Sequence, residues 1–134
     1  MTALERPRPI DQSGGETIQV GVRATAVIHE GAMVSLISGY AVNADTALAG
    51  PVIGVAAYSV TGGASSGDKS IDLIQGTFWR PNSGNVTIAH IGSPGYAVDD
   101  QTISSEETDG PLAGIIRAVD AVLGVQIEIG VAVV

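Results

Sequence analysis

Hydrophobic and polar residues alternate along Ile71–Pro81, a stretch that also holds the only Phe and the only Trp of the chain. A period of two residues is typical of a β-strand with one buried face. Strict alternation would place Phe78 on the face opposite the aliphatic residues of this stretch. We therefore expect a β-bulge at Gln75–Gly76, which returns Phe78 to their face and turns Trp79 outward. Since the chain has few other large side chains, we expect this strand near the centre of a sheet.

The same alternation recurs in short stretches along most of the chain, interrupted by turn residues. The expected strands cover residues 16–22, 24–28, 32–37, 40–42, 52–60, 95–98, 112–119 and 124–129. One short helix is expected over 86–91, where Asn85 can cap the start and Gly92 can end the helix in the left-handed conformation. Many short strands with Gly-rich turns predict an all-β fold, a compact β-barrel or β-sandwich.

Two pairs of segments are repeated within the chain. Gly-Tyr-Ala-Val occurs at 39–42 and at 95–98, and Leu-Ala-Gly occurs at 48–50 and at 112–114. The two separations differ, so the repeats do not define one register. They are compatible with an internal duplication and equally with two similar β-hairpins that share their turn chemistry.

The N-terminal stretch has a different composition. Glu5-Arg6-Pro7-Arg8-Pro9 contains two of the six basic residues, and each proline biases the residue before it toward an extended backbone. Ser13-Gly14-Gly15 then forms a flexible joint. We interpret residues 1–15 as an N-terminal arm and residues 16–134 as one β-barrel or β-sandwich domain. The arm is either a disordered tail or an extended segment that becomes ordered on a partner.

Composition excludes several classes of function. The net charge of −8 argues against binding of nucleic acid, which needs clustered Lys and Arg, and against docking on an anionic membrane. The 134 residues include no cysteine, so disulfides and thiolate metal sites are excluded. No apolar run reaches the roughly 20 residues of a membrane span. Charged residues make up only 15% of the chain, which suggests that part of the surface is covered in an assembly.

The motifs with possible chemistry are weak. The stretch 62–70 resembles a phosphate-binding loop, but Asp68 precedes the lysine and a strand follows where a helix is required. His29 and His90 lack the spacing of a metal pair, and a catalytic histidine would need a nucleophile and an orienting acid that the sequence does not reveal. We therefore expect no catalytic residue, no metal and no cofactor.

Acidic residues gather in one part of the sequence. They could in principle serve calcium binding or glycoside hydrolysis, but the ordered spacing of a calcium loop is absent and only five aromatic residues are available to line a cleft. We expect them to lie in two solvated turns. The residues concerned are Asp99, Asp100, Glu106, Glu107 and Asp109.

Trp79 and Arg80 are candidate contact residues. The two side chains could stack as an exposed pair that contacts another subunit or a partner, since tryptophan and arginine are enriched at protein interfaces. The alternative is that Trp79 covers the end of a barrel while Arg80 is solvated.

The order of these segments resembles the capsid cement or head decoration proteins of tailed bacteriophages and prophages. The resemblance covers about nine-tenths of the chain and depends on the series rather than on any single motif, with Thr87–Asp100 as its most telling part. The segments that carry it are an Arg/Pro-bearing N-terminus, GAMVSLISGYAV, PVIGVA, GDKSIDLIQGTFWRPNSG, TIAHIGSPGYAVDDQTI, LAGIIRAVD and VQIEI.

The resemblance implies a β-tulip-like structural protein without catalytic residues, located on the outer surface of the phage capsid, and in the host cytoplasm during assembly. It implies the major capsid protein as a partner, and further copies of the chain, often in a homotrimer that cements contacts between capsid subunits. We expect an extended arm to bind the capsid by adding a strand to a sheet. The expected contact residues are Leu4, Arg6, Pro7, Arg8, Pro9 and Ile10.

Two other functions remain open from the sequence. One is a carbohydrate-binding or adhesin-like β-module, which would need exposed aromatic residues on one face. The other is a small hydrolase, which would need histidine and carboxylate side chains to converge.

Overall fold

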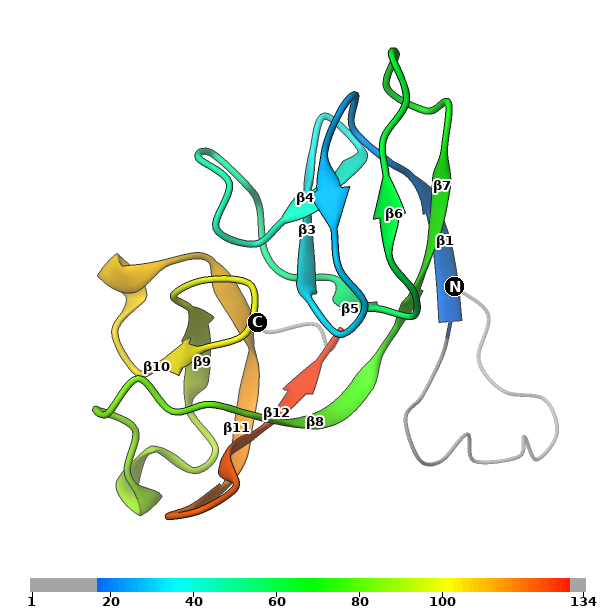
Figure 1. Cartoon of the computed structure of the whole chain (residues 1–134). Helices are drawn as coiled ribbons and strands as arrows, with labels where there is room; N and C mark the ends of the chain where they lie inside the picture. Colours follow the sequence, from blue (N-terminus) through cyan, green and yellow to red (C-terminus); the bar gives the residue numbers. More distant parts are fainter. Residues whose placement is uncertain (1–16, 131–134) are drawn as a thin grey trace, which may run out of the picture.

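The computed structural model describes residues 17–130, which form two five-stranded sheets and one two-stranded ribbon (Figure 1). The first sheet contains β1 (Thr17–Gly21), β3 (Met33–Ile37), β4 (Tyr40–Asn43), β5 (Gly54–Ala56) and β7 (Ser70–Ile74). The ribbon pairs β2 (Val27–Ile28) with β6 (Val60–Thr61). The second sheet contains β8 (Gly76–Arg80), β9 (Pro94–Ala97), β10 (Ile103–Ser104), β11 (Leu112–Asp120) and β12 (Gly124–Ile129). Two 3₁₀ turns complete the described part, η1 (Ile88–His90) and η2 (Glu107–Asp109).

The predicted all-β class and a compact, sandwich-like arrangement are confirmed. The sheets do not form a continuous barrel. In each sheet the two edges approach each other at one isolated parallel bridge, Val22 with Ala41 in the first and Asn82 with Ile103 in the second. Each sheet therefore curls around its own apolar interior.

The predicted strand 71–81 is in fact two strands that belong to different sheets. The predicted bulge is therefore wrong. The expected position inside a sheet holds for β7, which lies between β1 and β5, but not for β8, which is an edge strand of the second sheet. The chain crosses between the sheets at Gln75, whose side-chain amide donates to the Ile53 carbonyl oxygen at 3.0 Å. Because the strands are independent, the face of Phe78 does not depend on the alternation in β7. The outward direction of Trp79 is confirmed, with 38% of the residue exposed.

Two other predicted elements differ from the structure. Residues 52–60 do not form one strand, because β5 pairs in the first sheet and the chain then leaves it to form β6. The expected helix at 86–91 is only the turn η1, since its β-branched residues disfavour a helix. Thr87, not Asn85, precedes this turn as its N-cap, and the Asn85 side chain binds Ser104 and Ser105 instead. Gly92 does adopt the left-handed conformation, with φ +91°.

The two sheets repeat one topology. The first runs β1-β7-β5-β3-β4, and the second, taken from its opposite end, runs β8-β12-β11-β9-β10. If β1, β3, β4, β5 and β7 are matched in chain order with β8 to β12, the two orders are identical. We call residues 17–74 the first unit and residues 76–129 the second unit.

The pairing register is repeated as well. Val34 pairs with Gly54 in the first unit, and Gly95 pairs with Gly114 in the second, at positions 60 or 61 residues later. The turns that enter these strands also match. The Ala32 N–H donates to the His29 carbonyl oxygen at 3.0 Å, and the Ser93 N–H donates to the His90 carbonyl oxygen at 2.9 Å. The structural repeat therefore extends to individual hydrogen bonds.

The short repeats seen in the sequence are not the equivalent positions. Tyr40 lies in β4, the second strand of its hairpin, whereas Tyr96 lies in β9, the first strand of its hairpin. The residues that lead into β5 and β11 are equivalent instead. Gly50–Gly54 reads Gly-Pro-Val-Ile-Gly, and its equivalent Gly110–Gly114 reads Gly-Pro-Leu-Ala-Gly. Internal repetition is thus present, but in a different register from the one the sequence suggested.

The apolar core has two parts that meet between the units. One cluster fills the first unit and includes Ile71 and Leu73. The other fills the second unit and also receives Met33 and Val52 from the first unit. Backbone bonds tie the units together at this boundary, because the N–H groups of Met33 and Val52 donate to carbonyl oxygens of the second unit at 2.7 and 2.8 Å. Phe78 packs on the second cluster, apart from Ile71 and Leu73.

The two interiors are filled differently at equivalent positions. The first unit places a valine between alanines, whereas the second places a glycine between isoleucines. The equivalent positions, with the first-unit residue named first, are Val34 and Gly95, Ala56 and Ile116, and Ala41 and Ile103. A Cβ added at Gly95 would lie 2.7 Å from Ile127 Cδ1 and 3.1 Å from both Ile103 and Ile116. The larger isoleucines therefore occupy the space that Val34 occupies in the first unit.

Candidate binding surfaces

The predicted capsid-contact residues of the arm, Leu4 to Ile10, lie outside the described residues. The structure does show where the arm joins the body. β1 begins at Thr17 and forms one edge of the first sheet, paired only with β7 within that sheet. The first described residue, Thr17, therefore lies on a sheet edge.

Trp79 and Arg80 do not form a stacked pair. Successive residues of a strand point to opposite faces, and the Arg80 guanidinium lies over the Phe78 ring, 5.6 Å from its centroid. Burial lowers the pKa of Arg80, while the nearby Asp100 carboxylate opposes this shift. Arg80 is therefore half-buried rather than solvated, and Trp79 alone remains as an outward-facing contact candidate on the edge strand β8.

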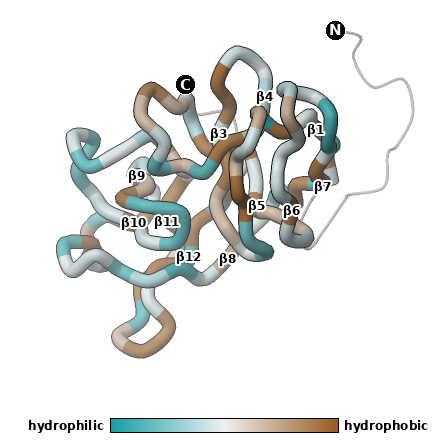
Figure 2. Tube along the Cα trace, turned by 45° about the horizontal axis from the view of Figure 1, so that its top comes forward, coloured by the Kyte–Doolittle hydropathy of each residue, from teal (hydrophilic) through white to brown (hydrophobic). Residues whose placement is uncertain are grey.

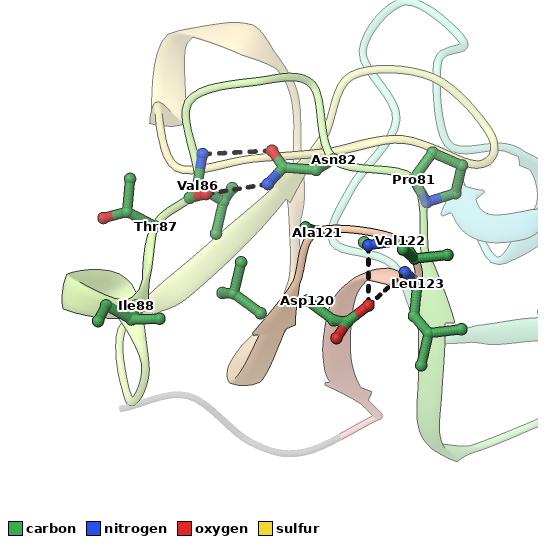
Figure 3. Close-up of a pocket in the computed structure, with 11 residues that line it drawn as sticks. Pro81, Asn82, Val86, Thr87, Ile88, Asp120, Ala121, Val122 and Leu123 are labelled. Carbon is green, nitrogen blue, oxygen red and sulfur yellow. Dashed lines mark hydrogen bonds between the residues drawn. The ribbon is translucent and has the colours of Figure 1, made fainter.

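A second exposed surface lies at the tight turn between β11 and β12. Figure 2 shows apolar colour where this turn projects from the body. A groove of about 740 Å³ separates the turn from the segment before η1 (Figure 3), and we call it the tip groove. Three of its apolar side chains are strongly exposed, with Val122 at 90%, Ile88 at 75% and Leu123 at 55%.

Hydrogen bonds to Asp120 fix the turn that exposes Val122 and Leu123. Asp120 Oδ2 accepts the backbone N–H groups of Val122 at 2.8 Å and Leu123 at 2.7 Å (Figure 3). These two bonds lower the pKa of the Asp120 carboxyl. On the opposite wall, the Asn82 side chain binds both the carbonyl oxygen and the N–H of Val86. The groove is therefore built from fixed turns on both sides.

Sequence reasoning missed the tip groove. The signal was present, because Ala121-Val122-Leu123 places three apolar residues between Asp120 and Gly124, where a turn is normally polar. The register of β11 with β12 shows that these residues form a hairpin end and not a continuation of either strand.

Of the five acidic residues expected in solvated turns, Glu106, Glu107 and Asp109 are exposed, whereas Asp99 and Asp100 are half-buried. Asp99 accepts from the N–H groups of Gln101 and Thr102, both at 2.8 Å, and Asp109 accepts from the Ser104 hydroxyl at 2.6 Å. In the Gly/Ser loop, Asp68 accepts from the Ser65 N–H at 3.0 Å. That loop leads into strand β7, which does not provide the helix that a phosphate-binding loop requires.

The two histidines are in separate places. His90 Nδ1 accepts the Thr87 N–H at 2.9 Å within its own turn. His29 lines a depression of about 310 Å³ at the boundary of the units, together with Arg80 and Asp100. Across residues 17–130, no group of three or more His, Cys, Asp or Glu side chains could hold a metal ion.

Comparison with family models, curated proteins and solved structures finds no match for this chain. Within residues 17–130, no helix has the length and apolar character needed to cross a membrane.

Proposed function

We propose that this protein is a structural virion protein without enzymatic activity, which binds the outer surface of a tailed-phage capsid and stabilises contacts between major capsid protein subunits. The proposal includes assembly of the chain as a homo-oligomer, with a trimer as the expected form. Its location would be the capsid exterior, and the host cytoplasm before assembly. The ordered series of sequence segments described above supports this proposal.

The structural observation that best supports the proposal is that polar side chains stabilise turns while large apolar side chains remain exposed. Asp68, Asp99, Asp109 and Asp120 accept hydrogen bonds within turns, so they stabilise the body. Large apolar side chains are meanwhile left exposed on the edge strand β8 and at the tip groove. Exposed aromatic and aliphatic anchors on a rigid body suit protein contacts, and capsid symmetry multiplies modest contacts into strong binding.

The arm would bind the capsid by backbone pairing of residues 4–12, aided by Arg6 and Arg8. Its origin at the edge strand β1 supports this role, because an extended segment beside a sheet edge can add a strand to a partner. The test uses heads assembled from the major capsid protein of the same genome, without this protein. Full-length chain and a chain lacking residues 1–13 are added, and occupancy is measured on sedimented heads.

We expect full-length chain to sediment with the heads and the truncated chain to lose most of its occupancy. A chain lacking only residues 1–3 is the control and should bind like the full chain. Equal occupancy of the 1–13 deletion would refute the role of the arm. If the full chain also stays in the supernatant, the capsid function itself is wrong.

A Trp79→Ala variant tests the body of the protein in the same assay. Trp79 faces outward from an edge strand, so its loss should lower occupancy with little change in the midpoint of urea unfolding. Tyr58→Ala provides a comparison with a similarly exposed aromatic residue, since 40% of Tyr58 is exposed. Unchanged occupancy for Trp79→Ala would remove this residue from the proposed contact.

The alternative is a carbohydrate-binding or adhesin-like module on the virion or cell surface. The two most exposed aromatic residues, Tyr58 and Trp79, belong to different units, one in a loop and one in an edge strand. This arrangement gives the alternative no specific support. Binding on a glycan array that is lost in both alanine variants would revive it.

A further inference from the structure

The two units differ most at one end, where the first unit is closed and the second is open. In the first unit the chain leaves β5 and pairs β6 with β2 across this end. The following glycines continue the contact, because the Gly62 N–H donates to the Ala26 carbonyl oxygen at 2.7 Å and Gly63 accepts from the Thr25 N–H at 3.0 Å. An extended segment thus covers residues 25–28.

Among the described residues, the second unit has no counterpart of β6. Its equivalent connection is the tight turn between β11 and β12, where Asp120 already pairs with Gly124. The stretch equivalent to 25–28 includes Val86, Thr87 and Ile88, and these residues form one wall of the tip groove (Figure 3). The groove therefore lies where the first unit holds an extended segment of its own chain.

The chain contains one short apolar segment whose composition fits this groove. Residues 131–134 read Val-Ala-Val-Val and lie outside the described residues. Valine is favoured in extended structure, and its side chains would cover the exposed Ile88 and Val122. The Asn82 side chain already binds the Val86 backbone, so the contact would depend on apolar side chains rather than on a full β-ladder.

Geometry argues that this segment cannot fill the groove of its own chain. Gly124 lines the groove, and Ile129 lies at the other end of β12. A strand of this length spans roughly 17 Å, and four extended residues reach at most about 14 Å. Folding back along β12 would leave no residue of 131–134 inside the groove.

We propose that residues 131–134 of one chain occupy the tip groove of a second chain and thereby link copies head to tail. Such a contact joins two different surfaces, so it builds a ring if the rotation closes and a filament if it does not. The inference rests on the homo-oligomer in the proposed function, but not on capsid binding. It is tested in solution without heads, so its failure is distinct from failure of the capsid proposal.

The experiment measures mass by analytical ultracentrifugation over a range of concentrations. The full-length chain should form oligomers, whereas a chain ending at Gly130 and a Val122→Asp variant should each have a dissociation constant at least tenfold higher. Leu48→Asp is the matched control, because Leu48 is 97% exposed and lies outside the groove. This variant should associate like the full chain. Urea unfolding of each variant confirms that it is folded.

A mixing experiment identifies the two halves of the contact. The chain ending at Gly130 retains the groove, and the Val122→Asp variant retains the tail, so their mixture should form a one-to-one dimer that neither forms alone. Oligomers of unchanged mass after removal of residues 131–134 would overturn the proposal. It would also be overturned by a full-length chain that stays monomeric, or by oligomers lost on deletion of residues 1–13 but not of 131–134.

Discussion

A glycine-to-valine exchange at the centre of the second unit would test whether the two interiors are alternative solutions to one packing problem. Gly95 is equivalent to Val34, and a Cβ at Gly95 would lie 2.7 Å from Ile127 Cδ1. Contacts under 3.0 Å force a neighbour to move, and overpacking of this kind costs about 1–3 kcal/mol. We therefore expect Gly95→Val to lower the free energy of unfolding by about that amount.

Removal of the facing isoleucine should rescue this variant. Ile116 is fully buried, and Ile116→Ala alone should cost about 2–5 kcal/mol through lost burial and a cavity. The double variant recreates the valine-and-alanine arrangement of Val34 and Ala56, so the new valine fills part of that cavity. We expect the double variant to be more stable than the sum of the single effects predicts, by at least about 1.5 kcal/mol.

The assay is urea unfolding followed by Trp79 fluorescence and by circular dichroism, with midpoint and slope fitted for each variant. Gly95→Val combined with Ile71→Val is the control, because Ile71 belongs to the cluster of the first unit. That pair should be additive within about 0.5 kcal/mol. Additivity of Gly95→Val with Ile116→Ala would refute the reasoning, since the valine would then not occupy the space of the isoleucine.

Three further predictions concern the second unit. A Cβ at Gly114 would collide with the Glu128 carbonyl oxygen of the paired strand, so Gly114→Ala should lower the free energy of unfolding by more than about 3 kcal/mol. Gly50→Ala should be tolerated, because the nearest atom to a Cβ at Gly50 would be 3.5 Å away. The pKa of the Asp120 carboxyl is lowered in the folded state, so its stabilising effect is present above the unfolded pKa of about 4 and is lost as pH falls through the folded pKa. The difference in urea-unfolding midpoint between wild type and Asp120→Asn should therefore shrink on acidification. A midpoint difference that grows would contradict this prediction. The surface ion pair between Arg117 and Glu128 should contribute at most about 1 kcal/mol, which a double-mutant cycle in low and high salt would measure.

Local alternation was enough to predict strands where one face is buried, but not the sheets that the strands join. β12 has the predicted bounds because Val125, Ile127 and Ile129 all face the core. The stretch around Gln75 was misread because a change of sheet and a bulge both shift the phase of an alternating pattern by one residue. Only the pairing partners distinguish the two cases, and these lie far away in the sequence.

The repeat and the tip groove were hidden for related reasons. The matching hydrogen bonds of His29 and His90 come from backbone groups, which leave little trace in the side-chain sequence. Equivalent core positions of the two units also carry residues of different size, large in one unit where they are small in the other. The two units therefore share few identical residues at the positions where their structures agree best. Ala121-Val122-Leu123 fell between two predicted strands, 112–119 and 124–129, but the exposure of its side chains cannot be recognised from an apolar run alone.

The different fillings of the two interiors have a consequence for folding. Two units of one topology in one chain could exchange equivalent strands, and misassembly of this kind is a common failure of repeated domains. A β9 strand that entered the first unit would bring Gly95 between two alanines and leave a void, while β3 in the second unit would drive Val34 against isoleucines. Each interior therefore rejects the strand of the other, which lets the nascent chain sort its own segments.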